Sequence, residues 1–165
     1  MLRKHIIPGP AHETPTSGTA LYPDGKDIPS LATVLVTSEA PGSPVDHLFD
    51  THDGPGGTRW MAASDGEQTI ILAFDTPQSI REVGLETEEL RTSRTQVLTL
   101  SLSRDGGKSY REVLRQEFVF SPPGTTFERE TWAVHAEGVT HLRVTIKPDK
   151  GAAPGRATLT SLAIR

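Results

Sequence analysis

The clearest pattern in the sequence is a strict alternation of hydrophobic and polar residues in two segments. In 95–103, Leu98, Leu100 and Leu102 alternate with threonine and serine. In 141–147, aliphatic residues occupy every second position between histidine, threonine and basic residues. A period of two residues places one set of side chains in a core and the other in solvent, as in antiparallel sheets. Both segments are therefore predicted to be half-buried β-strands.

Four further segments have strand character, and turn residues separate them. They are rich in β-branched or aliphatic residues and cover 31–37, 69–74, 80–86 and 158–164. Asp105-Gly106-Gly107 directly follows the strand predicted over 95–103, which is a hairpin signal. Segment 110–120 fits an amphipathic helix as well as a strand, so its structure stays open. Seven or eight strands between glycine and proline turns predict an all-β fold, an antiparallel β-sandwich or jelly roll of about eight strands.

Residues 1–30 differ from the rest of the chain because five prolines and three glycines interrupt them. Proline fixes φ and removes a hydrogen-bond donor, so no regular element is predicted there. We expect a Pro/Gly-rich N-terminal arm over 1–30, with Leu21 and Tyr22 as candidates for pinning it to the core. One β-sandwich domain is expected over 31–165.

Charge and composition narrow the classes of partner and compartment. The chain carries 17 basic and 21 acidic residues, a formal net charge of −4, which disfavours a broad nucleic-acid-binding surface. It has no cysteine, which excludes disulfides, cysteine-ligated metals and a cysteine nucleophile. The N-terminus lacks the apolar region of a signal peptide, and no segment approaches the ~18 apolar residues of a membrane span. A cytoplasmic protein is expected.

The densest polar cluster is the segment 46–53, which contains three aspartates and two histidines and leads into a glycine-rich stretch. Three interpretations stay open. Asp50, Asp53 and Thr58 could bind Ca²⁺ together with backbone carbonyls, because calcium prefers six to eight oxygen ligands. His47, His52 and a carboxylate could bind a catalytic transition metal. Alternatively, aspartates and glycines only shape turns, and no metal binds.

Binding chemistry is better represented than catalysis. The sequence has no nucleophile elbow, phosphate-binding loop or dinucleotide-binding motif. Segment 86–94 is polar and carries Arg91 and Arg94, whose planar donors suit hydroxyl, carboxylate or phosphate groups. The alternative is that it is only a solvated loop. Trp60 and Trp132 are candidate sugar-stacking platforms, although the position of Trp60 at a predicted strand start favours the core.

Several motifs, taken in order, resemble one known family. Asp50 is followed by Thr58-Arg59-Trp60 and then by the apolar strand 70–74. Ser103-Arg104-Asp105-Gly106 and Tyr110 come next, and the late strand 142–146 follows. In this order and spacing, over roughly 31–165, the sequence resembles the discoidin or coagulation-factor type C domains of the galactose-binding-like superfamily. The resemblance implies a jelly roll that binds its ligand with loops at one end, and a strand over 110–120.

The resemblance also implies positions for a metal and a ligand. Its structural calcium would match Asp50, Asp53 and Thr58, although the carboxylate that calcium-binding members often have in the last strand is missing from 157–162. Its ligand loops would lie near 39–43, 86–94 and 135–139. The first of these loops has no tryptophan or phenylalanine, which disfavours membrane insertion. The residues expected to contact ligand are Glu86, Glu88, Arg91, Arg94 and His135.

Together these observations predict a non-catalytic carbohydrate-binding module that has carbohydrate or a protein as its partner. A scaffold domain that binds protein or nucleic acid is the main alternative, and the acidic charge balance disfavours nucleic acid. A metal-dependent enzyme that uses His47, Asp50, His52 and Asp53 is the third possibility.

Overall fold

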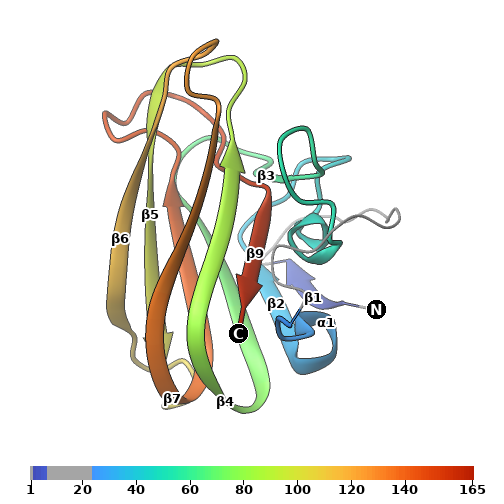
Figure 1. Cartoon of the computed structure of the whole chain (residues 1–165). Helices are drawn as coiled ribbons and strands as arrows, with labels where there is room; N and C mark the ends of the chain where they lie inside the picture. The colour runs from blue at the N-terminus through green and yellow to red at the C-terminus, as the bar shows by residue number, and fades with distance from the viewer. Residues whose placement is uncertain (1, 7–23) are drawn as a thin grey trace.

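The computed structural model describes residues 2–6 and 24–165, and within them nine strands, a short α-helix and a 3₁₀ helix (Figure 1). In chain order the elements are β1 (Arg3–Ile6), α1 (Ile28–Leu31), β2 (Ala32–Val36), η1 (Val45–Phe49), β3 (Trp60–Met61), β4 (Gln68–Glu88), β5 (Arg94–Ser103), β6 (Arg111–Phe120), β7 (Phe127–Lys147), β8 (Thr158–Leu159) and β9 (Ser161–Ile164).

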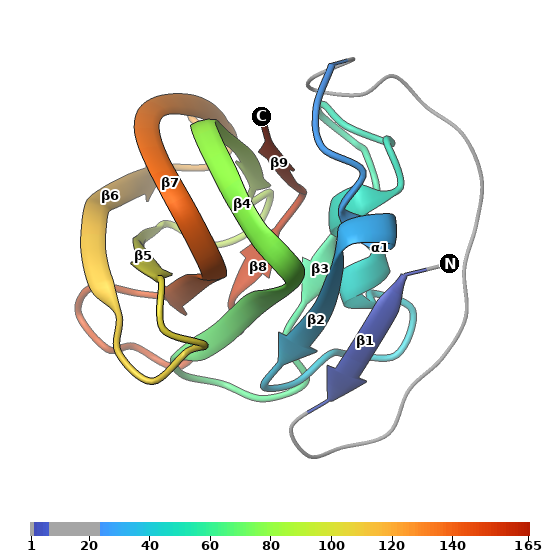
Figure 2. The ribbon, with the colours of Figure 1, turned by 90° about the horizontal axis from the view of Figure 1, so that it is seen from below.

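Two long strands, β4 and β7, organise the fold. The first half of β4 pairs with β2 and with the second half of β7, while its second half pairs with the first half of β7 and with β9. Register shifts between Ala73 and Glu82 mark the bend at which both strands pass from one layer to the other. The main sheet has the order β1-β2-β4-β7-β5-β6, and β9 also pairs with β4 (Figure 2). The predicted all-β sandwich is confirmed.

The predicted strands agree with the observed ones, with two differences in how they are divided. Segments 69–74 and 80–86, predicted as two strands, belong to the single strand β4, because the chain bends without leaving its pairing to β7. Segment 158–164, predicted as one strand, forms β8 and β9, which pair with different partners, β3 and β4. Segment 110–120, which the pattern left open, is strand β6 from Arg111 onward, as the family resemblance implied.

The N-terminal residues correct the predicted arm. Arg3–Ile6 form β1 and α1 begins at Ile28, so two regular elements stand where none was predicted. Because β1 pairs in parallel with β2, the sheet is mixed rather than purely antiparallel. The amine of Lys4 contacts the carboxylate of Asp46 and lies 3.3 Å from Glu39 Oε1, which ties β1 to the domain. Leu21 and Tyr22 lie outside the described residues.

The core lies between the layers. The alternating leucines of β5 are buried, as their period predicts. Trp60 is fully buried, and its Nε1 donates a hydrogen bond to the carbonyl of Ser38 at 3.0 Å. Trp132 is partly buried and packs against the core. Trp60 is therefore a core residue and not a stacking platform.

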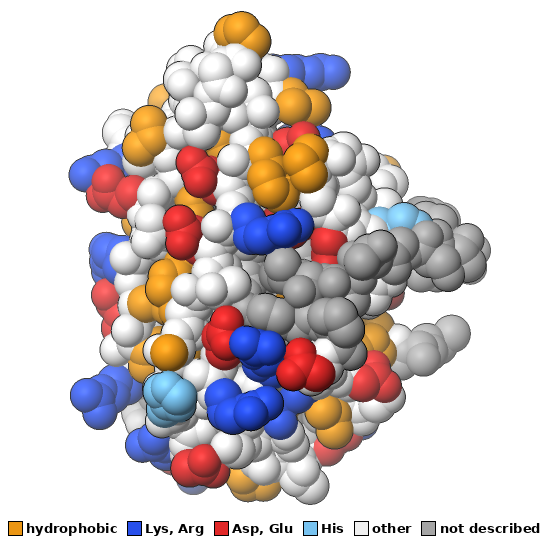
Figure 3. Space-filling model, viewed as in Figure 1, with side chains coloured by type: hydrophobic (Ala, Val, Ile, Leu, Met, Phe, Trp, Pro, Cys, Tyr) orange, Lys and Arg blue, Asp and Glu red, His pale blue; other side chains and the backbone are white. Residues whose placement is uncertain are grey.

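The face of the molecule seen in Figure 3 carries basic and acidic side chains in alternation, and its apolar side chains form small separate groups. None of the helices in the described part of the chain combines the length and the apolar character that crossing a membrane requires.

The strands run between two ends that differ in construction. The loops 89–93, 121–126 and 148–157 gather at one end, which we call the loop end; it lies at the top of Figure 1. Glu89 N donates to Thr126 O, which joins loops 89–93 and 121–126, and Lys150 N donates to Thr95 O, which joins loop 148–157 to the start of β5. The turn 104–110 and the bends of β4 and β7 lie at the opposite end, which we call the hairpin end.

Asp105 organises the turn between β5 and β6. Its carboxylate accepts hydrogen bonds from the hydroxyl of Ser109 at 2.5 Å, the hydroxyl of Ser103 at 2.7 Å and the backbone N–H of Ser109 at 3.0 Å. These donors hold the pKa of Asp105 well below its ordinary value. Gly107 follows at φ 82°, where a Cβ atom would lie 3.1 Å from the His141 ring, so only glycine fits without strain.

The depressed pKa of Asp105 predicts a contribution to acid sensitivity. Ionised Asp105 stabilises the folded state above its ordinary pKa of 3.8, and this contribution is lost as the pH falls below that value toward the lower folded-state pKa. We expect Asp105→Asn to lower the free energy of unfolding at neutral pH and to show a smaller further loss down to about pH 2. Urea unfolding across this range measures both effects. Exposed Asp65, as Asp65→Asn, is the control; parallel pH profiles of the Asp105 variant and wild type would contradict the prediction.

Candidate functional site

Two buried carboxylates at the end of β4 hold the segment 50–59 beside the loop end. Glu86 is fully buried; its Oε2 accepts from the backbone N–H of Gly54 at 2.6 Å, and its Oε1 accepts from Arg129 Nε at 2.6 Å. An ionised buried carboxylate needs such donors, because burial without them costs several kcal/mol. Glu86 is thus committed to contacts within the protein.

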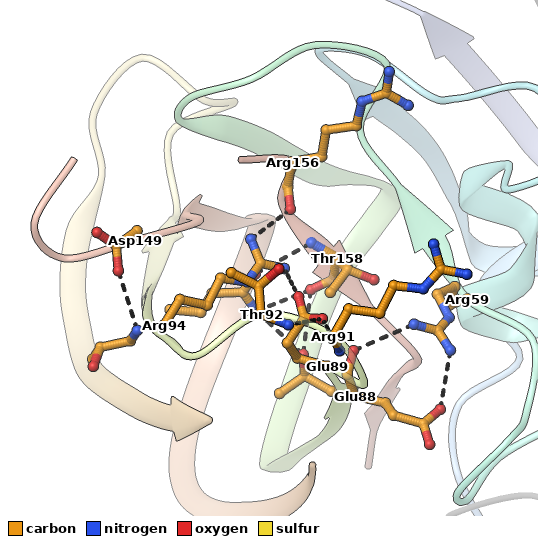
Figure 4. Close-up of polar contacts among 12 residues, drawn as sticks. Arg59, Glu88, Glu89, Arg91, Thr92, Arg94, Asp149, Arg156 and Thr158 are labelled. Carbon is orange, nitrogen blue, oxygen red and sulfur yellow. Dashed lines mark hydrogen bonds and ion pairs between the residues drawn. The ribbon is translucent and has the colours of Figure 1, made fainter. Parts of the chain in front are cut away.

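Glu88, two residues after Glu86 on β4, also holds the segment 50–59. It is 4% exposed, and both of its carboxylate oxygens lie 3.2 Å from the backbone nitrogen of Gly56. Arg59 donates from Nη2 to Glu88 Oε2 at 3.2 Å and from Nη1 to the Glu88 carbonyl at 3.4 Å (Figure 4). Glu86 and Glu88 were both predicted to contact ligand. Instead, their carboxylates accept hydrogen bonds from the backbone of the segment 50–59 and hold it in place.

Arg94 is likewise engaged in internal contacts. Its side chain is 8% exposed, its Nη1 donates to the Arg156 carbonyl at 2.8 Å, and its Nη2 lies 2.9 Å from Glu89 Oε2. The other oxygen of Glu89 accepts from the backbone N–H groups of Arg91 and Thr92. Arg94 and Glu89 together hold loops 89–93 and 148–157 in a defined arrangement.

Asp149 closes the other side of this arrangement. Its carboxylate accepts from the backbone N–H groups of Ala153 and Thr95, each at 3.2 Å. These amide donors lower the pKa of Asp149. Loop 148–157 is therefore held by its own capping carboxylate as well as by Arg94.

Arg91 and Arg156 are arginines of the loop end that are not engaged in internal ion pairs in the described part of the chain. Both side chains are exposed, and neither forms an ion pair with any residue in the described part of the chain. Figure 4 shows Arg91 extending toward Arg59, whereas the side chain of Arg156 points away from the cluster. Next to Arg91, Leu90 is 53% exposed. The loop end thus offers free guanidinium donors and an apolar side chain on a backbone that internal contacts already order.

His135 does not join the other predicted ligand residues. It lies in β7 near the bend, where Ala136 pairs with Ile80, so the segment 135–139 is part of a strand and not a free loop. Its backbone has φ 50°, in the left-handed region. The exposed ring lines a cavity of about 530 Å³ at the hairpin end together with Tyr110 and Arg104. The five predicted residues therefore do not form one site.

The predicted metal residues come together only in part. Asp50 Oδ2 accepts from the Thr58 hydroxyl at 2.6 Å, and Asp50 Oδ1 accepts from the backbone N–H of His52 at 2.9 Å. Asp53 instead lines a cavity of about 230 Å³ between η1, α1 and β9. One carboxylate beside one hydroxyl falls short of the six to eight oxygens of a calcium site, so the side chains as arranged do not form one, and calcium stays a prediction.

Of the two histidines considered for a catalytic metal, His47 is engaged with the backbone, whereas His52 Nδ1 is buried without a hydrogen-bond partner. His47 is buried, and its Nδ1 lies 2.8 Å from the carbonyl of Arg59. Within residues 2–6 and 24–165, no group of three or more histidine, aspartate or glutamate side chains is arranged to hold a metal ion. Sequence reasoning missed two residues that hold this region together, Arg129 and Asp149. Their partners, Glu86 and Thr95, lie 43 and 54 residues away, and no local pattern reveals such distant contacts.

Comparison with known proteins identifies the fold. No protein-family model matches the sequence, and no curated protein sequence matches it. Among solved structures, the third family 32 carbohydrate-binding module of a family 31 glycoside hydrolase from Clostridium perfringens superposes with a TM-score of 0.63, at 17% identity, over 85% of this chain and 93% of that one.

Two further structures were solved with a bound sugar. The family 32 module of AlyQ in complex with 4,5-unsaturated mannuronic acid has a TM-score of 0.56 and 21% identity, over 82% of this chain and 95% of that one. The family 32 module of NanJ from C. perfringens in complex with galactose has a TM-score of 0.55 and 14% identity, over 82% and 93%. The chain has the discoidin-like, galactose-binding-like fold that the sequence resemblance implied.

The role of Glu86 can be tested by removing its charge. Glu86→Gln leaves the Gly54 N–H with a weaker acceptor and the Arg129 guanidinium without its carboxylate, so we expect the free energy of unfolding to fall by about 1–3 kcal/mol. Hydrogen exchange at Gly54 should accelerate more than exchange in β5. Glu128→Gln, on the adjoining strand β7, is the matched control. Unchanged protection of Gly54 would show that Glu86 does not hold this segment.

Proposed function

We propose that the protein is a non-catalytic carbohydrate-binding module that binds a sugar at its loop end. The observation that carries the proposal is the shared fold of this chain and modules whose structures contain galactose or an unsaturated mannuronic acid. Fold likeness alone leaves function open, so the proposal also relies on what the loop end offers chemically.

The loop end suits the recognition of sugar hydroxyl groups. A guanidinium presents several planar donors, which can bridge neighbouring hydroxyls or meet a carboxylate, and Arg91 and Arg156 have theirs free. Leu90 supplies an apolar contact for the C–H face of a sugar ring. Because Glu89, Arg94 and Asp149 already order the loops, binding has little backbone entropy to overcome. Because the donors are exposed side chains on loops, we expect a dissociation constant on the order of 0.1–1 mM for a single sugar.

A direct test is to measure sugar binding by wild type and by a loop-end variant. We expect galactose, GalNAc-β-1,3-galactose or 4,5-unsaturated mannuronic acid, the sugars bound by the similar structures, to include a ligand. Arg91→Ala should weaken its binding about tenfold in isothermal titration calorimetry, since charge-assisted hydrogen bonds are lost. Arg81→Ala, an exposed arginine on β4 away from the loops, should bind like wild type. Equal affinities for wild type and Arg91→Ala would place the site elsewhere, and failure of all sugars on a broad glycan array would refute the function.

Calcium dependence is tested in the same assay. Because Glu86 and Glu88 hold the segment 50–59 through backbone amides, we expect EDTA to leave both sugar affinity and the melting temperature unchanged. A melting temperature that falls in EDTA and returns with CaCl₂ would instead support the calcium interpretation of Asp50 and Thr58.

A further inference from the structure

The outer face of the main sheet has a polar groove that the loop-end site does not use. The alternation of β5 places Thr99 and Ser101 on the face opposite its leucines, where Thr99 is half-buried and Ser101 is buried. The register places Thr145 beside Thr99 and Arg143 beside Ser101. With Tyr110 and Lys147 these side chains line a groove of about 370 Å³. Neither Arg91 nor Arg156 lines it.

Arg143 is a cation of this groove that has no carboxylate partner in the described part of the chain. Its Cζ lies 4.0 Å from the centroid of the Tyr110 ring, which holds the guanidinium in a fixed orientation. Its Nε is buried without a hydrogen-bond partner, and in the described part of the chain no carboxylate pairs with the side chain. Because no residue in the described chain neutralises this guanidinium, an anionic group supplied by a ligand would be favoured here.

The other charges of the groove leave it net positive. Arg115 is paired with Glu112 at 3.0 Å, and Lys147 Nζ donates to the carbonyl of Lys150 at 3.1 Å, which leaves its charge uncompensated. Glu67 is the second carboxylate of the groove. Three cations therefore face two carboxylates, on a protein whose formal net charge is −4. This local excess favours an anionic ligand.

We propose that the groove is a second binding site, which takes an acidic oligosaccharide whose carboxylate or sulfate group pairs with Arg143. Thr99 and Thr145, which are half-buried in the groove, offer hydroxyls to the sugar hydroxyls around that group. Lys147 lies four residues from Arg143 along β7, about 13 Å at the rise of a strand, and meets a second charge further along the ligand. That span exceeds one sugar ring, which is why the ligand is an oligosaccharide. The inference rests on the proposed function only in taking the ligand to be a sugar.

The experiment is an NMR titration of the full chain with three hexasaccharides: oligogalacturonate, its fully methyl-esterified neutral form, and a sulfated galacto-oligosaccharide. We expect the charged ligands to shift the amide signals of Thr99, Ser101, Arg143 and Thr145, and the neutral form to bind there at least tenfold more weakly. The two charged ligands distinguish carboxylate from sulfate as the paired group. Added salt should weaken the binding.

Variants separate this groove from the loop end. Arg143→Gln should weaken the groove's binding of the charged hexasaccharide about tenfold and leave shifts at 89–94 intact, whereas Arg143→Lys, which keeps the charge but loses the planar donors, should weaken it less. Arg81→Gln is the matched control, and melting curves confirm that each variant is folded.

The outcomes distinguish failure of this inference from failure of the proposed function. Shifts confined to the loop end, or an Arg143→Gln variant that binds like wild type, would overturn the groove and leave the loop-end site standing. Shifts at the groove without any at the loop end, for any of the sugars, would support the groove and refute the loop-end site. If no sugar shifts any amide, both are wrong.

Discussion

The pairing of β4 with β7 is the constraint on which the rest of the structure depends. The two strands stay hydrogen-bonded for most of their 21 residues each, and by bending together they contribute to both layers. Within the described chain, β2 and β9 attach to β4, and β5 attaches to β7 and carries β6. The bend therefore places the loops 89–93, 121–126 and 148–157 at one end of the molecule and the turn 104–110 at the other.

Two buried carboxylates at the end of β4 fix the segment that lies beside the loop end. Glu86 and Glu88 use their oxygens on the backbone of Gly54 and Gly56 and on two guanidinium groups. The desolvation of these carboxylates is offset only while every donor stays in place. Order at the loop end thus comes from internal ion pairs and amide hydrogen bonds, while Arg91 and Arg156 keep their donors for solvent or a ligand.

The candidate residues show where reasoning from local pattern stops. Segment 86–94 was recognised as polar and rich in charge, and it does border the loop end. The sequence does not show which of its charged side chains face inward, because their partners are distant in the chain. Glu86 pairs with Arg129, 43 residues away, and Arg94 donates to the carbonyl of Arg156, 62 residues away. The family resemblance predicts His135 near the arginines, whereas the bend in β7 carries it to the hairpin end. For Arg143, the sequence indicates only a position on the polar face of an alternating strand.

The sequence by itself determined the local elements and the fold class, because a period of two residues and turn residues act over a few neighbouring positions. Its pattern predicted the buried leucines of β5, the turn at Asp105 and a β-sandwich, and its resemblance to the discoidin domains implied the galactose-binding-like type. Only the tertiary structure decided that β1 joins the sheet in parallel, that β4 runs unbroken through its bend, and which charged residues stay without partners. Those features depend on pairing between segments far apart in the chain, since a side chain's partner is set by strand register and by the bend, and neither has a local sequence signal.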